Sequence, residues 1–215
     1  MTRLFDLADP AERAEGMEAA TRAVRRGELV VMPTDTVYGL GCDAFDAEAV
    51  GRLLEAKERG RDFPVPVLVG SVRALDGIAF GLTPQARELV TAFWPGALTL
   101  VCTAQPSLQW NLGDTGGTVG VRMPLHPAAL ELLQETGPMG VSSANRHGLP
   151  PATTVEEALG MLGPAVAVYL DGGATEDSVP STIVDVTGAV PKVLRQGALD
   201  LALLREVVPD LEPAA

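Results

Sequence analysis

The sequence predicts a single α/β domain in which helices pack on a sheet. Short apolar runs bounded by turn residues, such as 29–32, alternate along the chain with segments whose apolar residues recur at helical spacing, such as 14–24. No internal repeat, linker or low-complexity block interrupts the 215 residues, a length that suits one well-buried domain. We therefore expect one domain over residues 1–215, with its core at 15–200 and a frayed tail at 209–215.

Caps, prolines and glycines set the elements expected in the first half. Asp9-Pro10 is typical of a helix start, and Gly27 ends that helix. The segment 33–44, PTDTVYGLGCDA, opens with a proline that should end the preceding strand, and its glycines favour a turn. In order, we expect a helix after Asp9-Pro10, a strand at 29–32, a polar turn at 33–44, a helix after Asp46, a strand at 64–69, a short helix from Ser71, a helix from Thr83-Pro84 and a strand at 98–103.

The second half continues the mixed pattern. Thr154 and Glu157 have the spacing of a capping box and predict the start of a helix. Gly137-Pro138 should end the helix before it. The expected elements are a loop at 105–117, a strand at 118–123, a helix from His126-Pro127, a strand at 139–141, the helix after Thr154, a strand at 166–170, a loop at 171–180, strands at 181–186 and 193–194, and a helix at 200–208.

Composition excludes several functional classes. The chain has 16 Lys+Arg against 28 Asp+Glu, a net charge of −12, which repels a phosphate backbone and predicts weak or no direct tRNA binding. Two cysteines without CxxC spacing and two histidines exclude a multi-histidine or zinc-ribbon metal site, so we expect no protein-held metal. The N-terminus lacks an apolar signal core and no 18-residue apolar run follows, which predicts a cytoplasmic protein without membrane contact.

Polar side chains stand at the ends of expected strands. Thr34, Asp35, Thr36 and Tyr38 present hydroxyls and a carboxylate just after the strand at 29–32, where ligands of open α/β sheets bind. Further along the chain, the same pattern involves Lys57 with Arg59, Thr118 with Arg122, Ser143 with Asn145, Ser181 and Arg195. Each alone is more typical of a cap or a surface cation.

Arg122 and Arg195 are more informative, because each follows a short apolar run that should be a buried strand. A guanidinium that leaves a buried strand needs an anion. If two or three such cations converge, they form a phosphate and carboxylate site. The common nucleotide fingerprints GxxxxGK[ST] and GxGxxG are absent, as is the hydrolase motif GxSxG.

Eight ordered blocks together resemble one family, the threonylcarbamoyl-AMP synthases (the YrdC/TsaC-like family). The blocks are PTDTVYGLGCDA, AKERGRDFPVPVLV, WPGALTLV, TVGVRMPLHP, SSAN, DGG, STIVDV and VLRQGA, and they cover residues 15–200. The resemblance implies a YrdC-like α/β fold, a twisted, open, mixed sheet with helices packed on it, in its short single-domain form and with a cationic cleft. It also implies conversion of L-threonine, bicarbonate or CO2, and ATP to threonylcarbamoyl-AMP and pyrophosphate. The product would then be passed to a tRNA threonylcarbamoyl transferase complex.

The resemblance also implies roles for individual residues. The family's Lys-x-Arg and Ser-x-Asn signature, which would be catalytic, matches Lys57, Arg59, Ser143 and Asn145. Threonine-contacting positions match Thr36, Arg122, Ser143 and Ser181, with Arg122 holding the carboxylate. Nucleotide-contacting positions match Arg59, Thr118, Asn145, Thr153 and Arg195. Lys57, Arg59 and Arg195 would neutralise phosphate charge, and Mg2+ would accompany ATP without dedicated protein ligands.

Two positions depart from the family pattern. Phe63 stands where many relatives carry an asparagine that contacts the nucleotide, and Leu68 stands where many carry a histidine that contacts threonine. One contact to each substrate is therefore not carried over. The alternatives are a carbamoyl-adenylating relative, a double-stranded RNA or tRNA-binding module without catalysis, and a ligand sensor. The first needs additional segments for which 215 residues leave no room, and the second conflicts with the charge of −12.

Overall fold

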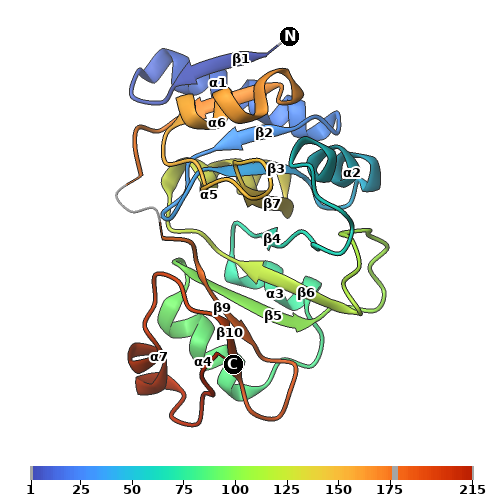
Figure 1. Ribbon diagram of the computed structural model, residues 1–215, viewed down its shortest axis with the longest axis vertical. Helices are drawn as coiled ribbons and strands as arrows, with labels where there is room; N and C mark the ends of the chain where they lie inside the picture. The colour runs from blue at the N-terminus through green and yellow to red at the C-terminus, as the bar shows by residue number, and fades with distance from the viewer. Residues whose placement is uncertain (1, 176–178, 215) are drawn as a thin grey trace.

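The computed structural model describes residues 2–175 and 179–214 and has the predicted architecture, a mixed open sheet with helices packed on it (Figure 1). Its strands are β1 (Arg3–Asp6), β2 (Val30–Met32), β3 (Gly39–Asp43), β4 (Val67–Leu68), β5 (Leu98–Thr103), β6 (Thr118–Arg122), β7 (Met139–Ser143), β8 (Val168–Asp171), β9 (Thr182–Asp185) and β10 (Lys192–Arg195). Its helices are α1 (Pro10–Arg25), α2 (Ala47–Ala56), α3 (Val72–Ile78), α4 (Pro84–Phe93), α5 (Pro127–Thr136), α6 (Val155–Leu162), a 3-10 turn at Gly163–Ala165 and α7 (Leu201–Val207).

The strands form one continuous sheet in which many sequence neighbours are separated. Their order is β1-β8-β2-β3-β7-β4-β6-β5-β9-β10. The pairs β1–β8, β2–β8, β4–β6 and β5–β9 are parallel and the remaining pairs are antiparallel. The first and last strands are therefore the two edges, and the chain termini lie at opposite ends of the molecule (Figure 1).

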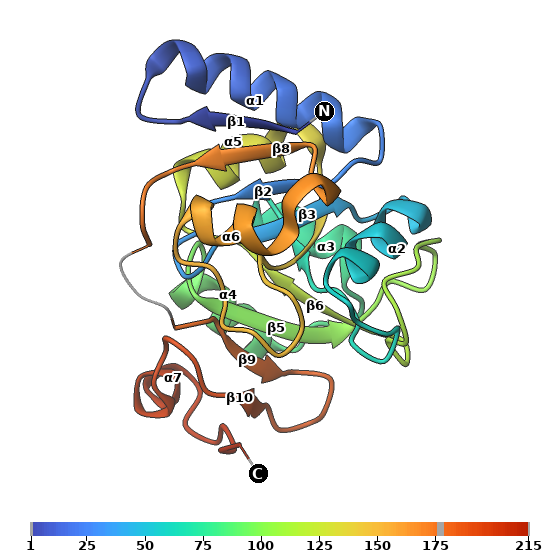
Figure 2. The same cartoon turned by 45° about the horizontal axis from the view of Figure 1, so that its top comes forward.

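Helices cover both faces of the sheet. α1 and α5 pack against β1, β8 and β2 in one apolar cluster, whereas α2 and α6 pack on the opposite face in a second, larger cluster (Figure 2). The predicted caps form: the Asp9 carboxylate accepts from the first turn of α1, and the Asp46 carboxylate accepts from the first turn of α2. Cys42 and Cys102 are free and buried. No helix in the described ranges is long and apolar enough to cross a membrane.

The segment 33–44 is not wholly a turn, as the sequence suggested, because its second half is the central strand β3. β3 pairs with β2 on one side and β7 on the other. A Cβ on Gly39 would lie 2.8 Å from Val141 Cγ1, and one on Gly41 would lie 2.8 Å from Met139 Cε. The two glycines therefore allow β7 side chains to pack directly onto a strand. The strand β1 was also not anticipated, because only Phe5 of its four residues is buried.

The tail predicted to fray is instead attached to the sheet through residue 212. Leu211 is fully buried, and the carbonyl of Glu212 accepts from the Val193 amide of β10 at 2.9 Å. The Arg205 guanidinium of α7 also donates to the Leu211 carbonyl. The expectation was wrong here because a single apolar residue among prolines and acids gives little sequence signal, although it fills a gap in the core.

Candidate active site

A cavity of about 490 Å³ lies over the middle of the sheet. Seven of the ten site residues expected from the sequence line it: Thr36, Arg59, Arg122, Ser143, Asn145, Ser181 and Arg195. Leu68 and Val141 belong both to this lining and to the apolar cluster under α1 and α5, so the cavity opens on that face of the sheet. As the sequence predicted, polar residues at strand ends contribute to it: Arg122, Ser143 and Arg195 are the last residues of β6, β7 and β10. Residues of the β2–β3 loop complete that part of the lining.

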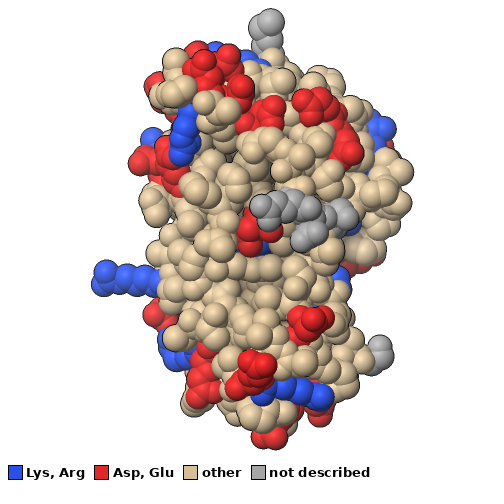
Figure 3. All heavy atoms as spheres, turned by 90° about the vertical axis from the view of Figure 1, so that its left-hand side faces the viewer, with Lys and Arg blue, Asp and Glu red and all other residues tan. Residues whose placement is uncertain are grey.

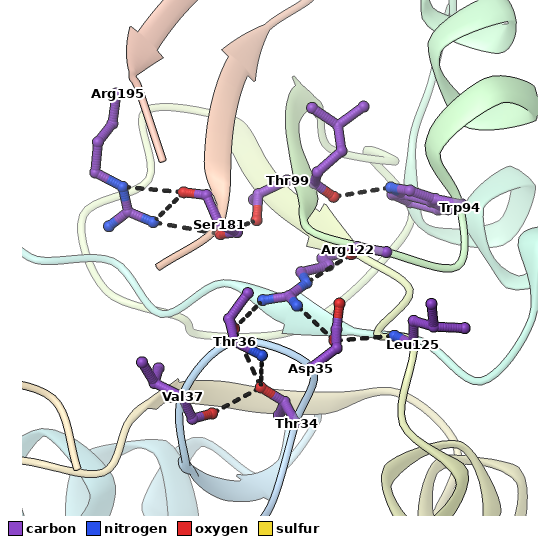
Figure 4. A network of polar contacts seen from close by, with 12 residues as sticks. Thr34, Asp35, Thr36, Val37, Trp94, Thr99, Arg122, Leu125, Ser181 and Arg195 are labelled. Atoms are coloured by element: carbon purple, nitrogen blue, oxygen red, sulfur yellow. Dashed lines mark hydrogen bonds and ion pairs between the residues drawn. The ribbon is translucent and has the colours of Figure 1, made fainter. Parts of the chain in front are cut away.

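Arg122 is the most constrained cation of the cavity (Figure 4). It is 6% exposed, and its guanidinium donates to Asp35 Oδ1 at 2.6 Å, to Thr36 Oγ1 at 2.9 Å and to the Gly96 carbonyl at 2.9 Å. Asp35 also accepts from the Leu125 amide at 2.9 Å, which fixes the carboxylate in turn. The anion that a buried arginine requires is thus supplied by the chain itself.

The contacts of Arg122 leave part of its guanidinium available to a ligand. A guanidinium has five N–H groups, and one each of Nε, Nη1 and Nη2 is used by the protein. One N–H on each terminal nitrogen therefore remains, which is the arrangement that binds a carboxylate with two parallel hydrogen bonds. Burial lowers the pKa of Arg122, while Asp35 raises it and the nearby Arg195 lowers it.

Ser181 and Arg195 form the opposite wall of the cavity (Figure 4). The Arg195 guanidinium donates to the Ser181 carbonyl through Nη2 at 2.7 Å and through Nε at 3.2 Å. The Ser181 hydroxyl lies 2.8 Å from the hydroxyl of Thr99, which also lines the cavity. Burial lowers the pKa of Arg195. No carboxylate of the described residues lies within ion-pair distance of this guanidinium, so it can accept an anionic ligand.

Lys57 does not line the cavity, which corrects its expected place beside the phosphates. It ends α2, is fully buried, and its ammonium donates to the Ser143 carbonyl, to the Asn145 carbonyl at 2.7 Å and to Asn145 Oδ1 at 3.3 Å. An ammonium has three N–H groups, and these contacts use all of them. Lys57 therefore holds the turn that follows β7 and leaves no donor for a ligand.

That turn presents two polar side chains to the cavity. The Ser143 hydroxyl donates to Asn145 Oδ1 at 2.5 Å, and the Asn145 amide nitrogen donates to the carbonyls of Arg146 at 2.9 Å and Leu149 at 2.7 Å. Asn145 is 3% exposed, so its orientation is set by the protein before any ligand arrives. The Ser-x-Asn pair and Lys57 are thus one hydrogen-bonded unit, although Ser143 and Asn145 lie 86 and 88 residues after Lys57 in the sequence.

The buried ammonium predicts a pH dependence of folding stability. Burial lowers the pKa of Lys57 to about 7, and repulsion from Arg59 adds to this effect. Below pH 7 the group is protonated in both the folded and the unfolded chain. Between pH 7 and about 10, where an ordinary lysine loses its proton, the unfolded chain binds the extra proton, so the free energy of unfolding rises with pH. We expect the urea midpoint of the wild-type protein to be higher at pH 9 than at pH 7. A Lys57→Met variant should lack this contribution to the pH dependence. Equal pH slopes in the two proteins would contradict it.

Arg59 reaches the cavity from the segment after α2. Its Nη1 donates to the Ser142 hydroxyl at 3.4 Å, and its Nε donates to His147 Nδ1 at 3.2 Å. Burial lowers its pKa. No carboxylate in the described ranges pairs with it, so Arg59 and Arg195 are two cations of the cavity wall without a protein counter-ion in those ranges.

Thr118 and Thr153 are not brought to the cavity. Thr118 begins β6, the strand that ends in Arg122, and its hydroxyl donates to the Thr115 carbonyl at 2.8 Å. The Thr153 amide and hydroxyl both donate to the Glu157 carboxylate, at 2.8 and 3.1 Å, and so help to cap α6. The two positions that depart from the family pattern, Phe63 and Leu68, do line the cavity.

Three further groups line or support the cavity and were not among the ten expected site residues. Thr99 contacts Ser181 from the start of β5, Asp35 neutralises Arg122, and His147 contacts Arg59. Asp35 follows a strand end, so its carboxylate was recognisable, but its partner lies 87 residues away. In the described part of the lining, no serine donates to a histidine and no cysteine is present. The site is therefore equipped to bind and orient anions rather than to supply a nucleophile.

The chain also carries no cluster of three or more His, Cys, Asp or Glu suited to a metal ion within residues 2–175 and 179–214. On the face shown in Figure 3, acidic side chains are spread over both the upper and the lower part of the molecule.

Sequence and structure comparisons both match this chain to proteins of one family. The family model of the Sua5, YciO and YrdC proteins, described as "Telomere recombination", matches residues 22–197. A putative threonylcarbamoyl-AMP synthase of Mycobacterium tuberculosis is 57% identical over 208 residues, which cover 97% of this chain and 96% of that protein. The crystal structure of P. abyssi Sua5 complexed with L-threonine matches with a TM-score of 0.92 at 33% identity and covers 99% of this chain. This chain spans only 62% of that Sua5 chain. The structure of E. coli YciO matches with a TM-score of 0.84 at 26% identity, covering 95% of this chain and 100% of that one.

Proposed function

The chain belongs to the Sua5, YciO and YrdC family, and from this premise we propose that it is an L-threonylcarbamoyladenylate synthase. It would convert L-threonine, bicarbonate or CO2, and ATP to threonylcarbamoyl-AMP and pyrophosphate. One observation carries the proposal: Arg59, Arg122 and Arg195, from three distant segments, line one cavity together with Ser143 and Asn145. The relatives' names and the threonine-bound Sua5 structure support threonine and ATP as the substrates.

In this proposal Arg122 binds the threonine carboxylate through its two remaining terminal N–H groups. Thr36 and Ser181 would flank the amino acid: the Thr36 hydroxyl accepts from the Arg122 guanidinium, and the Ser181 hydroxyl accepts from Arg195 on the opposite wall (Figure 4). Asp35 holds the Arg122 guanidinium in place and offsets its positive charge. The site would therefore select a carboxylate by the geometry of the two free N–H groups as well as by electrostatic attraction. Leu68 makes the wall beside Arg122 apolar, which suits the methyl group of a threonine side chain.

The reaction needs no protein nucleophile. The threonine amine forms a bond to the carbon of CO2 and loses a proton, which gives an N-carboxylate. A carboxylate oxygen then attacks the α-phosphorus of ATP, and the bond to the β,γ-pyrophosphate breaks. Arg59 and Arg195, whose guanidinium groups have no counter-ion in the described ranges, would neutralise the phosphates, while Asn145 and Ser143 orient the reacting groups. Mg2+ bound with ATP would supply further charge neutralisation.

The product is a mixed anhydride that must reach an acceptor before water hydrolyses it. We propose that it passes to a tRNA threonylcarbamoyl transferase complex, and that the synthase makes weak or no contact with tRNA itself. The net charge of −12 and the acidic surface in Figure 3 support this division of labour. We place the protein in the cytoplasm, where ATP and tRNA are available.

Pyrophosphate release from ATP tests the proposal directly. Each of the twenty amino acids is offered in turn, with and without bicarbonate, and the products are identified by mass. We expect release with threonine that depends on bicarbonate, together with a threonylcarbamoyl-AMP mass. Tight tRNA binding without pyrophosphate release would instead favour the RNA-binding alternative.

A further inference from the structure

Arg59 is held from two sides at the mouth of the cavity. His147 Nδ1 accepts a hydrogen bond from Arg59 Nε at 3.2 Å. The Phe63 ring lies on another side, with its centroid 5.4 Å from the guanidinium carbon, within cation–π range. The two rings also contact each other, with centroids 5.0 Å apart and planes inclined by 56°. All three residues line the cavity.

The hydrogen bond from Arg59 determines both the tautomer of His147 and the direction of the guanidinium. Because Nδ1 accepts, the imidazole must carry its proton on Nε2. The His147 backbone is itself fixed, since its amide donates to the Lys57 carbonyl at 2.8 Å. With Nε occupied by His147 and one Nη1 hydrogen by Ser142, the other hydrogen on Nη1 and both on Nη2 remain for a ligand.

We propose that His147 is a positioning residue for the nucleotide: it holds Arg59 so that the terminal nitrogens face the ATP phosphates. Phe63 completes the arrangement by packing against both side chains. This inference rests on the proposed function and assigns a role to a side chain that no family motif named above contains. An arginine loses much rotamer freedom when it is fixed for a phosphate, and a residue that fixes it in advance improves binding of that phosphate.

The test measures ATP affinity and steady-state kinetics in five proteins: wild type, His147→Ala, His147→Asn, Arg59→Ala and the double variant Arg59→Ala with His147→Ala. We expect His147→Ala to weaken ATP binding and raise its KM by about 10-fold, the scale of one hydrogen bond to a charged group. The KM for threonine should stay within twofold. His147→Asn should recover most of the loss, because its Oδ1 can accept where Nδ1 does.

The double variant distinguishes a role through Arg59 from a separate structural role. If His147 acts through Arg59, its removal should have little further effect once Arg59 is alanine, so the two changes are not additive. His126→Ala is the matched control, since the other histidine lies outside this cavity. We expect it to leave the KM for ATP unchanged.

Two outcomes would overturn the inference: wild-type ATP affinity in His147→Ala, or multiplicative effects in the double variant. A wild-type protein that binds ATP but releases no pyrophosphate with any amino acid would reject the proposed function instead. In that case the binding constants of the same variants still decide the role of His147.

Discussion

Replacing Arg122 by alanine should reduce kcat/KM for threonine by about 100-fold or more, the scale of a lost buried charge contact. The variant loses the two N–H groups proposed to bind the substrate carboxylate. It also leaves the Asp35 carboxylate, whose side chain is only 14% exposed, without its cation. We therefore expect a second effect, a loss of roughly 3–5 kcal/mol in the free energy of unfolding. Pyrophosphate release and urea denaturation measure the two effects separately.

The double variant Arg122→Ala with Asp35→Ala separates catalysis from stability. Removing both partners should restore most of the stability, because no unpaired charge remains buried, but it should not restore activity. Arg87→Ala is the matched control, since Arg87 pairs with Asp76 at an exposed site, with 59% and 56% of the two side chains accessible. Threonine kinetics within threefold of wild type in Arg122→Ala would show that another group binds the carboxylate.

Replacing Lys57 by methionine should lower kcat at least 10-fold although the side chain never reaches the cavity. The methionine fills a similar volume, but the oxygens of Ser143 and Asn145 lose their donor and the turn after β7 is no longer held. Each buried acceptor left without a partner costs about 1–3 kcal/mol. Both substrates should be affected, because Ser143 is proposed to contact threonine and Asn145 the nucleotide.

The pattern of KM changes tests this interpretation of Lys57. A direct phosphate contact predicts a raised KM for ATP alone, whereas a positioning role predicts higher KM values for ATP and threonine together. Lys192→Met is a suitable control, since it is the only other lysine of the chain and it lies outside the cavity lining. A Lys57→Met variant with a normal KM for threonine would contradict the positioning role.

The fold class and most elements could be predicted because their signals are local. Asp9 and Asp46 cap their helices as expected, and the prolines at 64 and 66 precede β4 rather than interrupt it. β3 could not be predicted, because Gly39 and Gly41 have low strand propensity and are accommodated only through their packing against β7. A tertiary contact here overrides the local preference for a turn.

The arginines of the candidate site could be predicted from the sequence, but the residues that they contact could not. Arg122 and Arg195 stand out because charged side chains seldom follow buried strands closely. The pairing of Arg122 with Asp35 depends on how the β2–β3 loop folds over β6, which no local pattern encodes. The position of Lys57 likewise depends on β7 lying beside β3, so a cation expected among phosphates instead supports a turn.

The strand order has a consequence for synthesis of the protein. Arg195 is on β10, the last strand, which pairs with β9 on one side and is attached on the other through Glu212. A chain still leaving the ribosome can complete the sheet from β1 to β5 with Arg122 in place, yet it lacks one of its three cavity arginines until residues near 212 have emerged. Nascent molecules should therefore consume no nucleotide before β10 has been synthesised and has paired with β9.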